Sequence, residues 1–507
     1  MPEHIRALLV IAFITFATFS LLKKFAMPHV SGANFYSWRN SILIITAILY
    51  LSNSFWLFVS LTFFYLLYLK KKIKAPAILY CLLLLAVPIH ISKSIGGINF
   101  ELNYVRLIAL VILLPAYLKI LGDTKALKFG RHKADIFFIA YLFIYFLCDI
   151  RGTTFTDGLR HLLYLVIDIF LPYYVLSRTI KTIEEINVVM LALFAAILVC
   201  GNIGIFEHIN QWLVYEVLNN IFNTVGSSGY LGRGNDLRAI SSTGFPIVLG
   251  YIMTIALGLL LYLKETKVML GKITVMLAFA MVAGGLYAPV SRGPWVGAAI
   301  LYIAFILYNK DVIRNLLKVK LLAACVLIAL AGTQLGDKLF NLLPFIGETE
   351  KHNVEYREKL FDVSMIIIER YPLLGSYNFL NEPEMTKLYQ GNVSNSVLKV
   401  DIVNSYIGIA LEQGLVGLIL FLGIFGAVLV SLTKSIRRAK KLPANHRLLG
   451  TSLIAIILSI MVMITTVSSI VIIPVVNFAI LGLAVAYTNI INNRIKIQFE
   501  EKSADNL

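Results

Sequence analysis

The sequence has few charged residues for its length. Only 14% of its 507 residues are Asp, Glu, Lys or Arg, whereas a soluble domain has about 25%. The hydrophobic content is 59% and the mean hydropathy is +0.81, more apolar surface than a water-soluble fold can bury. The charges are also clustered between apolar stretches long enough to cross a bilayer, which takes about 20 residues. A water-soluble protein is therefore excluded, and the sequence predicts an integral membrane protein.

Cysteine is also scarce. Cys81, Cys148, Cys200 and Cys325 all lie within apolar stretches, with no CxxC pair and no histidine at metal-ligand spacing. They are typical of small core residues. The sequence also contains no P-loop, no Ser-His-Asp arrangement and no metal-binding cluster. We therefore expect neither a metal nor another cofactor.

Apolar segments recur along most of the chain and predict an all-α, polytopic transmembrane bundle of about 14 helices. They lie near 6–22, 37–52, 55–69, 75–92, 104–121, 134–149, 159–177, 186–206, 241–263, 268–288, 294–309, 319–335, 404–432, 448–467 and 469–489. The count is approximate because residues 53–54 either divide a hairpin or interrupt one helix. The first segment lacks a cleavage site and is followed by Lys23 and Lys24, so we expect a retained helix instead of a signal peptide.

The formal net charge of +17 has an explanation other than nucleic-acid binding. Basic runs occur in alternate loops, at 70–74, 119–133, 178–181, 264–272, 310–320, 434–447 and after 492. Such runs mark cytoplasmic loops, and the sequence has no basic-aromatic motif for nucleic acid. The remaining loops are therefore predicted to be extracytoplasmic: 93–103, 150–158, 207–240, the turn at 291–293, and 336–403.

These loops divide the chain into five expected parts. They are N-terminal transmembrane helices with the loop 207–240 (1–235), further transmembrane helices (236–335), one large extracytoplasmic loop (336–403), C-terminal transmembrane helices (404–490) and a cytoplasmic tail (491–507). The large loop is too long for a simple connector, and its apolar spacing predicts a helix over Glu355–Arg370. We expect a small folded lid or acceptor site with short helices.

Arg292 is the charge that the topology explains least. It lies in the turn Tyr287-Ala288-Pro289-Val290-Ser291-Arg292-Gly293-Pro294-Trp295, on the predicted outer side. The planar guanidinium suits bidentate phosphate binding, and broken helices leave backbone N–H groups that can also face an anion. The alternative is an arginine that reaches lipid headgroups. We favour a binding role, with Tyr287 and Ser291 as neighbours in the site.

Two further arginines lie in the predicted outer loops. Arg238 precedes the segment Ser242-Thr243-Gly244-Phe245-Pro246, at the start of an apolar helix, and it is either an anion ligand or a solvated loop residue. Arg357 stands between Glu355 and Glu358, so it either pairs with them or binds a ligand.

A general base must reach the hydroxyl that it deprotonates, and its pKa should lie near ambient pH. The large loop offers His352 and Asp401 as the main candidates, with Glu348, Glu350 and Asp362 as others. His352 suits the pKa, although a lone loop histidine is commonly just exposed. Asp401 precedes the next helix beside Asn404, near the membrane boundary.

Four stretches, in this order, resemble the bacterial O-antigen ligase and O-antigen polymerase superfamily. They are the segment Arg238 to Pro246 with Leu249 and Gly250, the Ser291-Arg292-Gly293 turn with Pro294 to Gly297, Arg357 with Glu369 to Gly375, and Val403-Asn404-Ser405-Tyr406 with Leu411 to Gly417. Each motif is weak alone, and the ordered set, over roughly 235–430, is more specific.

The resemblance implies a metal-independent, inverting glycosyltransferase that takes glycan from a polyprenyl-pyrophosphate carrier, such as undecaprenyl pyrophosphate. By this likeness Arg292, Arg238 and Arg357 would bind the pyrophosphate, with Asn404, Tyr287 and Ser291 nearby and Asp401 or His352 as base. Cationic side chains stabilise charge that develops on a leaving pyrophosphate. The expected location is the bacterial inner membrane, with the site facing the periplasm. Membrane lipids and a chain-length regulator or another export protein are the expected partners, and nucleic acid is not.

One position departs from the family pattern. Ligases typically have histidine before the asparagine, as the expected base, whereas this chain has Val403. The departure favours a polymerase of a surface polysaccharide (O-antigen, capsule or exopolysaccharide) that acts on a lipid-linked repeat unit. A ligase that transfers glycan to lipid A core in lipopolysaccharide assembly, or to another acceptor, is the first alternative. A transporter or flippase is the second, although the unusual arginines gather on one face and do not line a central path.

Overall fold

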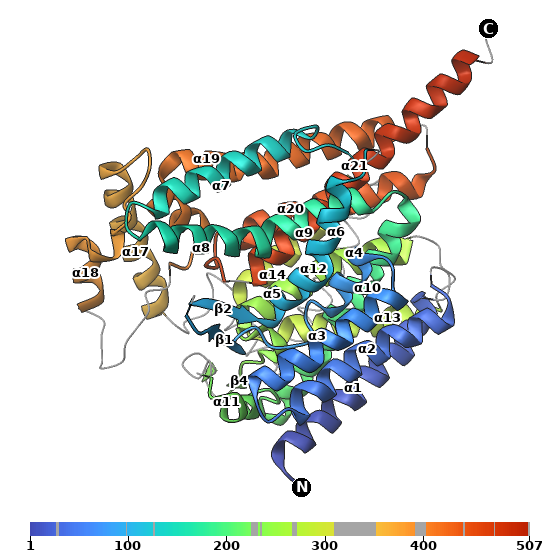
Figure 1. Ribbon diagram of the computed structural model, residues 1–507, viewed down its shortest axis with the longest axis horizontal. Helices are drawn as coiled ribbons and strands as arrows, with labels where there is room; N and C mark the ends of the chain where they lie inside the picture. Colours follow the sequence, from blue (N-terminus) through green and yellow to red (C-terminus); the bar gives the residue numbers. More distant parts are fainter. Residues whose placement is uncertain are drawn as a thin grey trace, which may run out of the picture.

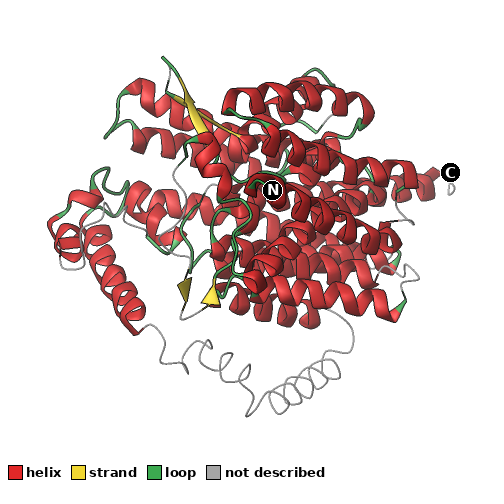
Figure 2. Cartoon of the chain, turned by 90° about the horizontal axis from the view of Figure 1, so that it is seen from below, coloured by secondary structure: helices red, strands yellow, loops and turns green. Residues whose placement is uncertain are grey.

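The protein is a helical membrane bundle, as the sequence predicts. The computed structural model describes residues 1–26, 30–97, 99–124, 127–224, 232–233, 236–265, 271–308, 351–390, 402–439, 442–470 and 472–504. Within these ranges the chain is almost entirely helical, with two short two-stranded hairpins (Figure 2). Eight of the described helical segments are long and apolar enough to cross a membrane, and two shorter ones are also apolar. The segment expected at 319–335 lies outside the described residues.

The described elements follow one another along the chain in this order. The first half contains α1 (Glu3–Ala26), α2 (Gly32–Leu51), α3 (Phe55–Lys72), α4 (Pro76–Leu83), β1 (Ser92–Ile95), β2 (Phe100–Asn103), α5 (Tyr104–Ile108), η1 (Ala109–Leu113), α6 (Leu114–Leu121), α7 (Lys133–Asp149), α8 (Phe155–Leu165), η2 (Val166–Phe170), α9 (Leu171–Thr179), α10 (Ile183–Asn210) and α11 (Val217–Phe222). The second half contains β3 (Gly232–Arg233), β4 (Asp236–Leu237), η4 (Ser241–Thr243), α12 (Pro246–Glu265), α13 (Lys272–Tyr287), α14 (Arg292–Leu307), α17 (Lys351–Arg370), η5 (Phe379–Asn381), α18 (Pro383–Gln390), α19 (Ser405–Arg438), α20 (Ala444–Met463) and α21 (Ile472–Ala504).

The helices differ in how much of their surface faces the protein. The helices α10, α12 and α21 are buried along most of their membrane-spanning length, and α10 packs against α1, α4, α12 and α13. By contrast, α1 and α19 expose large apolar side chains such as Phe13 and Ile419. In a bilayer such side chains face lipid tails, so the outer helices need no polar surface.

The two ends of the bundle are distinct. At one end Arg438 of α19 donates to Asn492 of α21 at 2.9 Å, and Arg494 lies 3.6 Å from Glu184, at the start of α10. We call this end the basic face. In Figure 1 the C-terminal end of α21 extends from it, while α11, α17, α18 and the β1–β2 hairpin lie toward the other side of the molecule. We call that second end the loop face.

Three local features differ from the expected elements. The apolar segment 75–92 is helical only over Pro76–Leu83. The segments 104–121 and 159–177 each contain a π-helical turn, η1 and η2, which apolar spacing did not predict. Finally, α21 continues to Ala504, so most of the expected tail from 491 is helical. The helix expected over Glu355–Arg370 is present as part of α17.

Candidate functional site

A short segment, residues 236–241, crosses the loop face beside the end of α10, and we call it the strap. The carboxylate of Glu207 is fully buried and accepts three backbone N–H groups, from Val214 at 3.2 Å, Ile240 at 3.0 Å and Ser241 at 2.7 Å. A carboxylate is acceptor-only and has room for several donors. Glu207 therefore fixes the end of the strap to α10.

The rest of the strap is fixed by the end of α10, through His208 and Gln211. The carbonyl of Leu237 lies 2.8 Å from Nδ1 of His208, and its N–H donates to the side chain of Gln211 at 2.9 Å. Gln211 ends α10 with a left-handed backbone, φ 52°. Because Leu237 is held through both its backbone groups, the position of Arg238 is set by the end of α10.

The turn between α13 and α14 carries Arg292 as the first residue of α14. Val290 has φ 47°, a rare conformation for a β-branched residue, and its N–H donates to Tyr287 at 2.8 Å. Backbone strain of this kind costs about 1–3 kcal/mol and gathers at functional sites. Pro294 follows in the first helical turn, where the missing N–H is tolerated.

The strap and this turn are bonded to each other. The N–H of Ala239 donates to the carbonyl of Ala288 at 3.1 Å, and Nε of Arg238 donates to the carbonyl of Pro289 at 3.1 Å. Arg292 follows Pro289 by three residues, so the two arginines lie on adjoining pieces of backbone. The structure thus brings together Arg238 and Arg292, which are more than fifty residues apart in the sequence.

Aromatic rings cover one side of this turn. The ring of Tyr287 stacks on Trp295, with centroids 6.2 Å apart, and stands at 89° to the ring of His208, 5.4 Å away. The indole N–H of Trp295 donates to Leu286 at 3.0 Å. The predicted neighbour Tyr287 therefore lies between His208 of α10 and Trp295 of α14. Ser291 is only 4% exposed.

The start of α19 joins the same region through the segment after α20. A side chain at Gly293 would overlap Thr466, and Ser405 donates its hydroxyl to Val467 at 2.7 Å. Asn404 caps α19 by accepting the N–H groups of Tyr406 and Ile407. Its side-chain oxygen thus has a structural role, which the sequence pattern did not predict.

The large loop contacts α19 at a second place, farther from the start of this helix. Within α19, Gly414 has φ 66° and ψ −170°, and the break lets Leu415 donate to the carbonyl of Pro372 at 2.8 Å. Ser376 donates to Leu411 at 2.8 Å, and Arg151 donates to Leu374 and Gly375. Two of the sequence motifs, 372–375 and 411–417, therefore form one junction.

The structure describes the other predicted residues only in part. Arg357 is exposed on α17, which packs against α18 and α19. His352 lies in the first turn of α17, but its side chain is outside the described residues, as is Asp401. Among the described residues, no three His, Cys, Asp or Glu side chains are placed to hold a metal ion.

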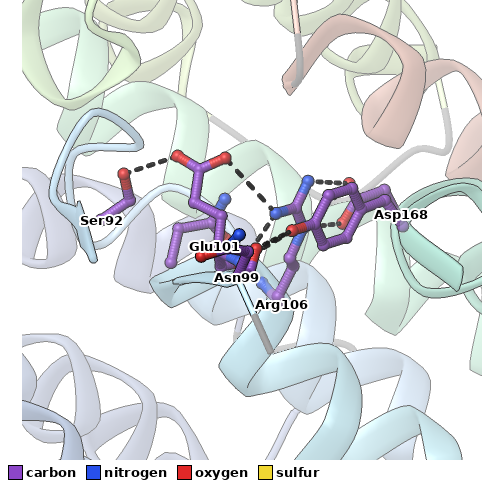
Figure 3. Close-up of polar contacts among 7 residues, drawn as sticks. Ser92, Asn99, Glu101, Arg106 and Asp168 are labelled. Atoms are coloured by element: carbon purple, nitrogen blue, oxygen red, sulfur yellow. Dashed lines mark hydrogen bonds and ion pairs between the residues drawn. The ribbon is translucent and has the colours of Figure 1, made fainter. Parts of the chain in front are cut away.

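Sequence reasoning missed a second polar cluster on this side of the bundle (Figure 3). Arg106 forms a buried ion pair with Asp168 at 3.0 Å, donates to the carbonyl of Glu101 at 2.7 Å and stacks on the ring of Tyr164 at 3.7 Å. Arg106 lies in α5, just before η1, and Asp168 lies within η2; together with Glu101 they tie the β1–β2 hairpin to the bundle. A charge within an apolar stretch is a signal that could have identified both.

Comparison with known families gives one match. Residues 276–422 match the family model described as O-Antigen ligase. The matched range includes Arg292, α17 and the start of α19, whereas the strap and α10 precede it. No curated protein matches the chain.

Proposed function

Because residues 276–422 match the family model described as O-Antigen ligase, we propose that this chain polymerises a surface polysaccharide. It transfers glycan from a polyprenyl-pyrophosphate carrier to a lipid-linked repeat unit, at the loop face, which is extracytoplasmic. The observation that carries this proposal is the bonding of the strap to the α13–α14 turn, which puts Arg238 beside the segment of Arg292.

The two arginines supply the chemistry that a pyrophosphate leaving group requires. As the bond to the anomeric carbon breaks, negative charge grows on the phosphate oxygen, and fixed guanidinium groups stabilise it. Nε of Arg238 is held by Pro289, and α14 begins at Arg292, with the positive end of its dipole at the loop face. The guanidinium of Arg238 is therefore held before the substrate arrives, and the helix start adds positive potential at Arg292.

A ligase is the second candidate, since the family model carries that description. The residue before Asn404 is valine, which cannot accept a proton, and this departure from the ligase pattern favours the polymerase. Residues 372–376 contact α19 farther from its start than the segment that adjoins the Arg238–Arg292 region. This junction supports an acceptor site that α17 covers. Its position on the loop face suits a second lipid-linked substrate that arrives from the membrane.

The proposal is tested by replacing Arg292 with Ala and, separately, with Lys. We expect Arg292→Ala to abolish long glycan chains while the protein still inserts into the membrane. Arg292→Lys should restore them only in part, because a lysine ammonium cannot form the two parallel hydrogen bonds that a guanidinium makes to a phosphate. Arg131→Ala, at an exposed arginine in the turn before α7, is the matched control and should leave chain length unchanged. Persistence of long chains in inserted Arg292→Ala would reject the pyrophosphate clamp.

Polymerase and ligase differ in the acceptor. Purified protein incubated with lipid-linked repeat units alone should produce a ladder of lengths if it is a polymerase. A product that forms only when lipid A core is added would instead establish the ligase.

The orientation can be tested on α18. Lys387 is exposed there, so Lys387→Cys should react with a membrane-impermeant maleimide from the outer side of intact inner membrane. The parent chain, whose described cysteines are buried, gives the background. Labelling only after the membrane is permeabilised would reverse the assignment of the two faces.

A further inference from the structure

His208 stands at the junction of the three segments that form the site. It lies in the last turn of α10, beside Glu207, and its Nδ1 is 2.8 Å from the carbonyl of Leu237, the residue before Arg238. Its ring stands edge-on to Tyr287, five residues before Arg292. No sequence motif points to this histidine, because α10 precedes the matched family region.

The contact with Leu237 fixes the tautomer of His208. A backbone carbonyl only accepts hydrogen bonds, so Nδ1 must carry the hydrogen. In the neutral ring the other nitrogen, Nε2, then holds a lone pair on the far side of the imidazole. Nε2 makes no hydrogen bond within the described part of the chain, and His208 is partly exposed. A histidine oriented through one nitrogen and open at the other is the arrangement of a general base.

Other histidines near the loop face are less suited. His90 packs against Gly244, but both its ring nitrogens are enclosed by protein. His161 is bonded to Asp149 at 2.9 Å, near the junction of the large loop and not at the strap. His208 is bonded to the strap itself.

We propose that His208 is the general base of the glycosyl transfer and replaces the histidine that this chain lacks at position 403. This inference rests on the proposed function. The acceptor hydroxyl gives its proton to Nε2 of His208 as its oxygen bonds to the anomeric carbon. The bond from that carbon to the pyrophosphate oxygen breaks, and its electron pair stays on the polyprenyl pyrophosphate, beside Arg238 and Arg292. His208 then releases the proton to solvent.

The experiment separates a proton acceptor from a structural tether. In His208→Asn, the amide nitrogen can donate to Leu237 as Nδ1 does, but it cannot take up a proton. We expect the turnover of purified protein on lipid-linked repeat units to fall about 10²- to 10⁴-fold, the usual contribution of general acid–base catalysis, with an unchanged apparent unfolding temperature. His208→Ala should lose activity to the same extent, and added imidazole should restore part of it.

The acid limb of the pH–rate profile provides a second readout. Wild-type turnover should fall toward acid, because a protonated imidazole cannot take the proton of the acceptor hydroxyl, and the residual activity of His208→Asn should lack this limb. The titratable and charged groups on the elements around His208 are Glu207, Asp236, Arg238, Tyr287, Arg292 and, at the start of α1, Glu3, His4 and Arg6. Of these, Glu207 is turned away, toward the backbone of the strap.

The outcomes distinguish this inference from the function on which it rests. If wild type makes a ladder and His208→Asn does so at a similar rate, His208 only tethers the strap and the base lies elsewhere. If wild type transfers no glycan in any of the assays, the proposed function itself fails. His446→Asn, at a histidine beside Arg494 on the basic face, is the matched control and should retain turnover.

Discussion

Gly375 and Gly414 form a reciprocal contact between the large loop and α19. A side chain on Gly375 would overlap the backbone at Leu411, and one on Gly414 would overlap the backbone at Leu373. Both glycines have positive φ, 65° and 66°. The two backbones can therefore approach closely enough for Leu415 to donate to Pro372 at 2.8 Å, and this contact fixes where α17 stands over the bundle.

Replacement of either glycine by alanine should undock the loop. At Gly414 the backbone lies in a region essentially limited to glycine, so Ala adds strain of about 1–3 kcal/mol to the steric overlap. We expect Gly414→Ala and Gly375→Ala to expose α17 and α18 to added protease and to shorten the glycan. Gly426→Ala, in the same helix with open space around it, should leave both properties unchanged. Equal protection in all three variants would show that the junction does not hold the loop.

Glu207 should be more important to the strap than its single charge suggests. In Glu207→Gln one carboxylate oxygen becomes an NH₂ group that faces N–H donors, and an unsatisfied buried donor costs about 1–3 kcal/mol. We expect a lower apparent unfolding temperature and lower glycan transfer. The exposed Glu216 provides the control Glu216→Gln, with neither effect. Unchanged transfer in Glu207→Gln would mean that the strap does not need this carboxylate.

The Arg106–Asp168 pair should behave as a buried ion pair. Its side chains are 5% and 10% exposed, and removal of one partner leaves an uncompensated charge that costs about 3–5 kcal/mol. We therefore expect Arg106→Met and Asp168→Leu each to lower the apparent unfolding temperature in detergent. The double variant should recover much of the loss, since two apolar groups leave no charge unpaired. A double variant as unstable as the sum of the singles would contradict this account.

The contact between α17 and α18 should weaken in acid. Arg370 bonds to Glu384 at 2.6 Å, and this hydrogen bond holds the pKa of Glu384 below its ordinary value of 4.5. The folded state therefore gains stability from the pair above pH 4.5 and loses it as the pH falls through the lowered pKa. Hydrogen exchange of α18, corrected for the intrinsic rate, should rise below this pH. Arg370→Ala should remove most of that pH dependence, and an unchanged dependence would exclude the pair as its cause.

Local sequence patterns determined the membrane fold. Scarcity of charge and long apolar segments predict a helical bundle, and helices such as α10, α12 and α20 lie where these patterns placed them. The helix over Glu355–Arg370 was also predictable, because apolar spacing is a local property of the chain. The two π-helical turns were not, since nothing in the period of apolar residues specifies them.

The residues of the candidate site could be predicted from the sequence only in part. Arg292 stood out because a cation near a predicted outer turn opposes the charge bias of the loops. Glu207 and His208 did not, because one polar pair at the end of an apolar helix has no motif. Their roles depend on contacts with Leu237, Ile240 and Ser241, some thirty residues later.

The sequence by itself thus determined that this protein is a helical membrane bundle and which residue types its chemistry can use. These properties follow from the hydropathy and charge of short segments. Tertiary structure decided which of those residues meet. The bonding of the strap to both α10 and the α13–α14 turn joins distant segments, and such contacts are set by the packing of whole helices and not by any local pattern.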